Sequence, residues 1–183
     1  MNSRKKVFAI IGSAGSDSAN EALVKHIATE TKGVLELSIF NALKTLPHFD
    51  PELSVHQTPD IIVNVRREIE AADGVLICTP EYVFSIPSGL KNVIEWCVAT
   101  TVFSNKPVGI ITASANGAKG HEELQLILQT IEAKCTADTS LLIPGVKGKI
   151  DAMGKIKDAY TLQQLQHFIQ SFQQLLEISG ATH

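Results

Sequence analysis

Short runs of apolar, largely β-branched residues alternate along this chain with longer segments whose apolar residues recur every three or four positions. The short runs predict strands and the longer segments predict helices. Three of the runs are almost wholly apolar, which is typical of strands covered on both faces, as in a parallel sheet wrapped by helices. The alternation therefore predicts a doubly wound, three-layer α/β sandwich. The expected strands are 6–11, 34–39, 74–79, 108–113 and 139–143, and the expected helices are 20–31, 59–72, 88–100, 120–133 and 161–179.

Length and composition fit one domain that spans residues 1–183. The chain is 44% hydrophobic and 19% charged, so it can bury a core and is not a disordered polymer. Its net charge of −3 and its one short basic run, Arg4 to Lys6, argue against nucleic-acid binding, which needs a concentrated basic face. Aromatic residues at 5% also argue against a stacking surface for single strands.

No apolar run is long enough to cross a bilayer, and the run after Lys6 is too short for a signal peptide. The three cysteines, Cys78, Cys97 and Cys135, form no Cys-x-x-Cys pair, so we expect buried thiols in a reducing compartment, the cytoplasm. The six histidines show no metal-binding spacing, and we expect no metal site.

Three stretches that follow predicted strands are candidates for a ligand site, because ligands of doubly wound sheets bind at the carboxyl ends of the strands. The first, residues 12–20, has two glycines and several hydroxyls. It resembles neither a Walker A loop nor the dinucleotide Gly-x-Gly-x-x-Gly, and it suits a single terminal phosphate such as that of FMN. An ordinary turn with Asn20 as the helix N-cap explains it equally well.

The second stretch, 80–87, is stiffened by two prolines and exposes Tyr82 and Phe84, so it can face a planar ring or simply pack in the core. The third, 114–120, is rich in glycine, which permits close backbone approach to a ligand or an ordinary turn. Two further irregular segments, 41–58 and 144–158, are expected to be loops over a site or parts of a subunit contact.

With these motifs in place, the sequence resembles the NADPH-dependent FMN reductase family, whose members have a flavodoxin-like fold and include quinone, chromate and azo-dye reductases. Pro80-Glu81-Tyr82, followed by Leu90-Lys91-Asn92 and Glu95-Trp96, matches a long family motif. The first loop matches the family's Gly-Ser-x-Arg-x-x-Ser-x-Asn at Gly12, Ser13, Ser18 and Asn20.

The resemblance implies a five-stranded parallel sheet of order 2-1-3-4-5 and an FMN site at its carboxyl edge. It implies a homodimer or homotetramer, and hydride transfer from NADPH or NADH through bound flavin to a small acceptor such as a quinone, free flavin, azo compound or metal oxyanion. No side chain is assigned a catalytic role, and Glu81 is expected to act mainly through its backbone. The implied flavin contacts are Ser13, Ser18, Ala19, Asn20, Pro80, Glu81, Tyr82, Val83, Ser114, Asn116 and Gly117.

Two departures from the family pattern bear on flavin affinity. Gly15 stands where the family has an Arg that contacts phosphate, and Val83 stands where it has Asn. Lys119 is a candidate to replace the missing cation. A non-catalytic electron carrier similar to flavodoxin is the alternative function, although the weak net charge argues against it, and a relative that has lost its flavin is the third.

Overall fold

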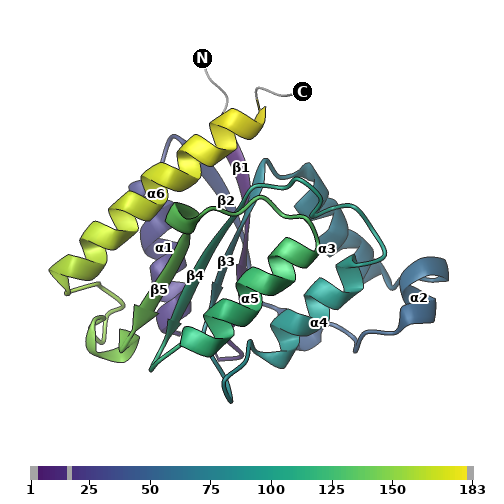
Figure 1. The fold of residues 1–183 in the computed structure, drawn as a ribbon, viewed down its shortest axis with the longest axis horizontal. Helices are drawn as coiled ribbons and strands as arrows, with labels where there is room; N and C mark the ends of the chain where they lie inside the picture. Colours follow the sequence, from purple (N-terminus) through teal and green to yellow (C-terminus); the bar gives the residue numbers. More distant parts are fainter. Residues whose placement is uncertain (1–3, 16–17, 181–183) are drawn as a thin grey trace.

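The computed structural model describes residues 4–15 and 18–180, which form a five-stranded parallel sheet covered by helices on both faces (Figure 1). The strands lie in the order β2-β1-β3-β4-β5, as the resemblance implies. All four neighbouring pairs are parallel, so every strand ends at the same edge of the sheet. The strands are β1 (Lys5–Ile11), β2 (Leu35–Phe40), β3 (Gly74–Thr79), β4 (Val108–Ser114) and β5 (Ser140–Pro144).

Each face of the sheet has its own apolar core because side chains alternate along a strand. Phe8 and Ile10 of β1 point into one core with α3 (Asp60–Ala71), α4 (Ser88–Cys97) and α5 (Ala118–Thr130). Val7, Ala9 and Ile11 point into the other core with α1 (Ala19–Glu30) and α6 (Ala159–Gly180). The three-layer sandwich is therefore confirmed, and α6 packs on the sheet of its own chain.

The structure corrects two details of the first connection and of the segment after β2. Ser18, and not Asn20, is the N-cap of α1: its hydroxyl accepts a hydrogen bond from the Glu21 N–H at 3.1 Å. The segment 41–58 contains a short helix, α2 (Pro51–His56), which begins where the Asp50 carboxylate caps two backbone N–H groups. Figure 1 shows α2 projecting from the body of the molecule.

Residues of the long family motif anchor this segment to α4. The Asn92 amide donates to the Pro47 carbonyl at 2.9 Å, and its oxygen accepts from the Phe49 N–H at 2.7 Å. The Trp96 indole also donates to the Pro47 carbonyl, at 2.9 Å, and its ring meets Phe49 edge to face. These side chains therefore position the connection after β2, which explains their place in the motif without any contact to a ligand.

The second irregular segment, 144–158, folds beside α1 as a small hairpin in which Ile150 pairs with Ile156. Its Gly154 approaches Ala22 of α1. Within the described ranges, no helix has both the length and the apolar character needed to span a membrane.

Candidate functional site

The loops after β1, β3 and β4 meet at the carboxyl edge of the sheet because these three strands are neighbours. Gly12, at the end of β1, lies against Thr79 of β3 and donates its N–H to the Cys78 carbonyl at 2.8 Å. Ser114, at the end of β4, donates its hydroxyl to the Glu81 carbonyl at 3.4 Å. The structure thus brings together the three stretches that the sequence singled out.

The first loop offers two hydroxyls at the N-terminus of α1. The Oγ atoms of Ser13 and Ser18 lie 2.7 Å apart, and Ser18 caps the helix. A helix N-terminus carries partial positive charge and favours an anion, so hydroxyls placed there fit the phosphate of FMN. Ser16 and the acidic Asp17 belong to the same loop of the sequence but lie outside the described residues.

Asn20 faces the core and not the loop. Its amide donates to the Ala113 carbonyl at 3.3 Å, its oxygen accepts from the Cys78 thiol at 3.4 Å, and the residue is only 3% exposed. It therefore joins α1 to β3 and β4 on the inside of the sheet edge. Ala19, the first residue of α1, is half-buried and has only its backbone to offer a phosphate.

The second loop forms a tight turn that projects from the edge. The backbones of Tyr82 and Ser85 exchange two hydrogen bonds of 2.9 and 3.0 Å, and the intervening Val83 and Phe84 have φ of 52° and 60°. Positive φ at both central residues is the type I′ geometry, which prefers Asn and Gly. For a β-branched or bulky residue it costs about 1–3 kcal/mol per position.

The third loop is tied to the second through the carboxylate of Glu81. Its two oxygens accept the N–H groups of Gly117 at 3.2 Å and Gly120 at 2.8 Å, so Glu81 caps the N-terminus of α5. Gly117 is buried and has φ of 91°, which explains the glycine.

This contact changes the expected source of hydrogen bonds to the flavin ring. The glycine-rich stretch 114–120 was a candidate for close backbone approach to a ligand, but in the structure the N–H groups of Gly117 and Gly120 bind Glu81. The N–H groups of Ala115 and exposed Asn116 bond to no acceptor within the described chain. Both N–H groups are therefore available to a ligand.

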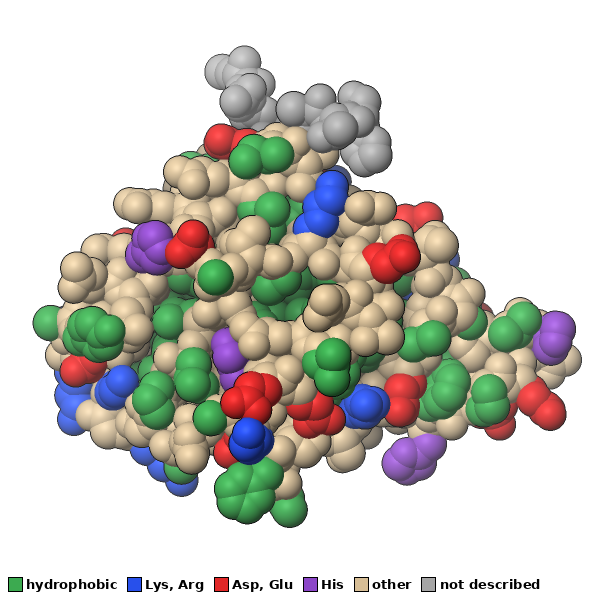
Figure 2. All heavy atoms as spheres, viewed as in Figure 1, with side chains coloured by type: hydrophobic (Ala, Val, Ile, Leu, Met, Phe, Trp, Pro, Cys, Tyr) green, Lys and Arg blue, Asp and Glu red, His purple; other side chains and the backbone are tan. Residues whose placement is uncertain are grey.

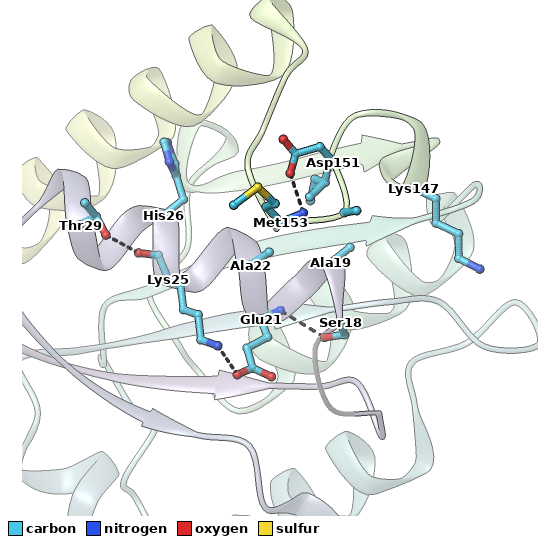
Figure 3. A pocket seen from close by; sticks show the side chains of 13 residues that line it. Ser18, Ala19, Glu21, Ala22, Lys25, His26, Thr29, Lys147, Asp151 and Met153 are labelled. Carbon is cyan, nitrogen blue, oxygen red and sulfur yellow. Dashed lines mark hydrogen bonds and ion pairs between the residues drawn. The ribbon is translucent and has the colours of Figure 1, made fainter.

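The family's missing arginine leaves space at Gly15, where an added Cβ would meet nothing within 4 Å. Lys119 pairs with Glu122 at 2.7 Å on exposed helix surface and is therefore already engaged. A cavity of about 540 Å³ opens beside the phosphate loop, between α1 and the 147–154 segment, and shares Ser18 and Ala19 with the predicted site (Figure 3). Lys147 extends at its rim, and Lys25 on its wall pairs with Glu21 at 2.8 Å.

Burial favours the neutral form of two thiols and of one imidazole in this structure. Burial raises the pKa of the Cys78 thiol far above its ordinary value and that of Cys97 to about 12, so neither is a nucleophile. Burial lowers the pKa of His121, although nearby Glu122 opposes the shift. The described part of the chain contains no cluster of three His, Cys, Asp or Glu side chains able to hold a metal ion.

Comparison with known proteins agrees with this geometry. The profile of a family described as NADPH-dependent FMN reductase matches residues 5–146. The chain belongs to this family. It is thus an oxidoreductase of the FMN-dependent, NAD(P)H-using class, and its fold is flavodoxin-like.

Its relatives in the family are reductases of several acceptors. The chain is 26% identical to a quinone reductase of Escherichia coli, over 97% of this chain and 98% of the relative. It is 28% identical to the NADH:(hydroxy)cinnamate reductase subunit CrdA of Vibrio ruber, over 90% and 84% of the two chains. Among solved structures, FerB, a flavoenzyme NAD(P)H:(acceptor) oxidoreductase of Paracoccus denitrificans, is 27% identical with a TM-score of 0.84, over 96% and 98% of the two chains.

Sequence reasoning missed Gly120 and Glu123, which shape the site from α5. A Cβ on Gly120 would lie 3.2 Å from the Ser85 carbonyl oxygen, so glycine lets the helix approach the loop more closely than a residue with a side chain would. Glu123 accepts hydrogen bonds from Ser85 and Ile86. For Glu123 the sequence offered only a carboxylate near the start of a predicted helix. Its favourable interaction with the helix dipole accounts for such a residue without any hydrogen-bond partner in the loop.

Proposed function

We propose that this chain binds FMN at the carboxyl edge of the sheet and uses it to pass reducing equivalents from NADPH or NADH to a quinone-type acceptor. The observation that supports this best is the convergence of the hydroxyl-bearing loop of β1, the projecting turn after β3 and the free N–H groups after β4 on one edge. The names of the quinone-reducing relatives support the acceptor class.

Each loop has a separate task in this proposal. Ser13 and Ser18, at the positive end of α1, hold the phosphate. Pro80, Glu81, Tyr82 and Val83 border the isoalloxazine ring along their backbone, and Ser114 and Gly117 shape the opposite wall. The free N–H groups of Ala115 and Asn116 donate to the ring's pyrimidine side, where fixed donors favour developing negative charge.

The hydride chemistry belongs to the cofactor, and the protein supplies binding and orientation. Asn20 contributes indirectly in this proposal, by fixing the start of α1 against β3 and β4.

We also propose that the chain works as a homodimer or homotetramer in a reducing, cytoplasmic setting. The family resemblance supports the homodimer or homotetramer, and exposed apolar side chains on α2 and α3, such as Val55 and Ile61, support a subunit contact. The three free cysteines support the reducing, cytoplasmic setting.

Titration of the apoprotein with FMN tests the site. Replacing Ser13 with Ala should weaken FMN binding about tenfold, since a charge-assisted hydrogen bond to phosphate contributes about 1.5–3 kcal/mol. Ser38→Ala is the matched control, because Ser38 is an exposed serine within β2, paired with Phe8 of β1, and belongs to none of the three loops. Equal affinities of the Ser13 variant and wild type would remove the phosphate site from this loop.

A further inference from the structure

The turn between Tyr82 and Ser85 is strained, yet its tip gains nothing from packing. Val83 is 94% exposed and Phe84 is 72% exposed, although both have left-handed backbones that apolar and β-branched residues rarely adopt. Burial therefore does not hold the turn in this conformation. Some other interaction must stabilise it.

Two carboxylates supply that stabilisation from both sides of the contact between the loop and α5. Glu81 reaches from the loop to the helix, where it accepts the N–H groups of Gly117 and Gly120. Glu123 reaches from the helix back to the loop, where its Oε2 accepts the Ser85 hydroxyl at 2.6 Å and the Ile86 N–H at 3.0 Å. We call these four hydrogen bonds the Glu81–Glu123 clamp.

The clamp fixes both ends of the turn and leaves its tip in solvent. The residues on either side of the tip are bound to α5, while Val83 and Phe84 extend outward. The loop after β3 projects at the carboxyl edge of the sheet in Figure 1, and apolar side chains project from the same rim in Figure 2. The turn thus adopts its projecting form from contacts within the chain alone.

We infer that Glu81 and Glu123 are positioning residues that hold Val83 and Phe84 ready as an apolar wall of the acceptor subsite, which selects a flat, uncharged acceptor. This inference rests on the proposed function, because it places the wall beside the proposed flavin ring. The half-exposed Tyr82 extends the same apolar surface.

The charges around the tip favour a neutral acceptor over an anionic one. The tip itself carries no charged side chain, and the two clamp carboxylates are engaged in hydrogen bonds between the loop and α5. Lys119, a cation of the same helix, is paired with Glu122. A neutral quinone would bury apolar surface against the tip, whereas an anion would lose hydration there without gaining an ion pair from the tip.

Steady-state kinetics of the FMN-loaded protein with a neutral benzoquinone and with anionic ferricyanide test the role of the clamp. Glu123→Gln should raise KM for the quinone about fivefold, since a charge-assisted hydrogen bond is roughly twice as strong as a neutral one. The anaerobic rate of flavin reduction by NADPH, measured on the same variant, should change by a smaller factor than the quinone KM. Glu122→Gln is the matched control: it removes the same charge one residue away on the same helix, from a side chain that binds Lys119 and not the loop.

Val83→Asn separates the tip's role in binding from its role in folding. Asn tolerates positive φ, so this variant should raise the thermal midpoint by about 2–4 °C. The same change should raise KM for the quinone about tenfold through loss of apolar contact, with little effect on KM for ferricyanide. A merely structural role would move stability and acceptor binding in the same direction.

Three results would overturn the inference. These are equal effects of Glu123→Gln and Glu122→Gln, an unchanged quinone KM in Val83→Asn, or dissociation of an oligomer by Val83→Asn in sedimentation measurements, which would assign the tip to a subunit contact. Wild-type protein that binds no FMN would remove the proposed function itself. If the wild-type protein reduces quinone but any of the three results is obtained, this inference is wrong and the proposed function still holds.

Discussion

At Gly12 the end of β1 has no room for a side chain, because a Cβ there would lie 2.2 Å from the Thr79 hydroxyl oxygen. Gly15, three residues further along the same loop, has open space around it. The two glycines therefore differ in purpose: the first permits close contact between neighbouring strand ends, and the second has no steric reason in the described structure.

Replacing each glycine with alanine tests this difference. Gly12→Ala should lower the free energy of unfolding by about 1–3 kcal/mol, the usual cost of overpacking. Gly15→Ala is the matched control in the same loop and should change stability by no more than about 0.5 kcal/mol. Chemical denaturation measures both, and equal stability of the two variants would contradict the close packing at Gly12.

Gly15→Arg tests whether the family's missing cation limits flavin binding. The open space admits the longer side chain, and a guanidinium can donate two hydrogen bonds to a phosphate. We expect the Kd for FMN to fall about tenfold, the equivalent of about 1.4 kcal/mol. Gly15→Gln, similar in length and uncharged, is the control; if it tightens binding as much as Arg does, charge is not the cause.

The roles of single residues were predicted only in part from the sequence. Ser13 and Ser18 were predicted to act together on a phosphate; their hydroxyls lie side by side, and the phosphate contact stays a prediction. Asn20 was expected to be the N-cap of the helix. The N-cap is Ser18, two residues earlier, so Asn20 lies inside the first turn and its side chain faces the core. A shift of two residues changes helical phase by about half a turn, and sequence patterns rarely fix a helix end that closely.

At the scale of elements, α5 is tied to the sheet through His121. Its Nδ1 lies 2.8 Å from the Thr112 hydroxyl of β4, and its Nε2 lies 3.2 Å from the Ser140 hydroxyl of β5. Burial lowers the pKa of this imidazole below its ordinary value of 6.5, with Glu122 opposing the shift. The neutral ring is therefore the form that the folded protein favours.

This preference predicts a loss of stability in acid. As the pH falls below 6.5, His121 becomes protonated in the unfolded chain at a higher pH than in the folded chain. The contribution of neutral His121 to the free energy of unfolding is therefore fully present above pH 6.5 and decreases as the pH falls. His121→Gln removes the titrating group, so its thermal midpoint should fall less than that of wild type between about pH 7.5 and about pH 5.5. Equal losses in both proteins would contradict this role.

Elements with a clear apolar period were predicted, and those set by tertiary contacts were not. All five strands and five of the helices lie where the spacing of apolar residues predicts them, with ends within a few residues. The short helix α2 has no apolar stripe and depends on its Asp50 cap and on the nearby anchors to Asn92 and Trp96. The turn at Val83 and Phe84 lacks the Asn or Gly that announces a type I′ turn.

At the scale of the whole molecule, the sequence predicted the sandwich because almost wholly apolar runs, typical of buried parallel strands, alternate with segments of helical spacing. The location of the site followed from the same reasoning, since polar loops after neighbouring parallel strands must meet at one edge. The Glu81–Glu123 clamp was not predictable, because it joins positions about forty residues apart whose carboxylates look like ordinary surface charges.

Anaerobic reduction of the FMN-loaded protein tests most directly the claim that one edge of the sheet binds a working flavin. Stoichiometric NADPH should bleach the visible absorption band of protein-bound FMN, and a neutral benzoquinone added afterwards should restore it. A protein that binds no FMN at micromolar concentrations, or whose bound flavin stays oxidised in the presence of both NADPH and NADH, would contradict the account.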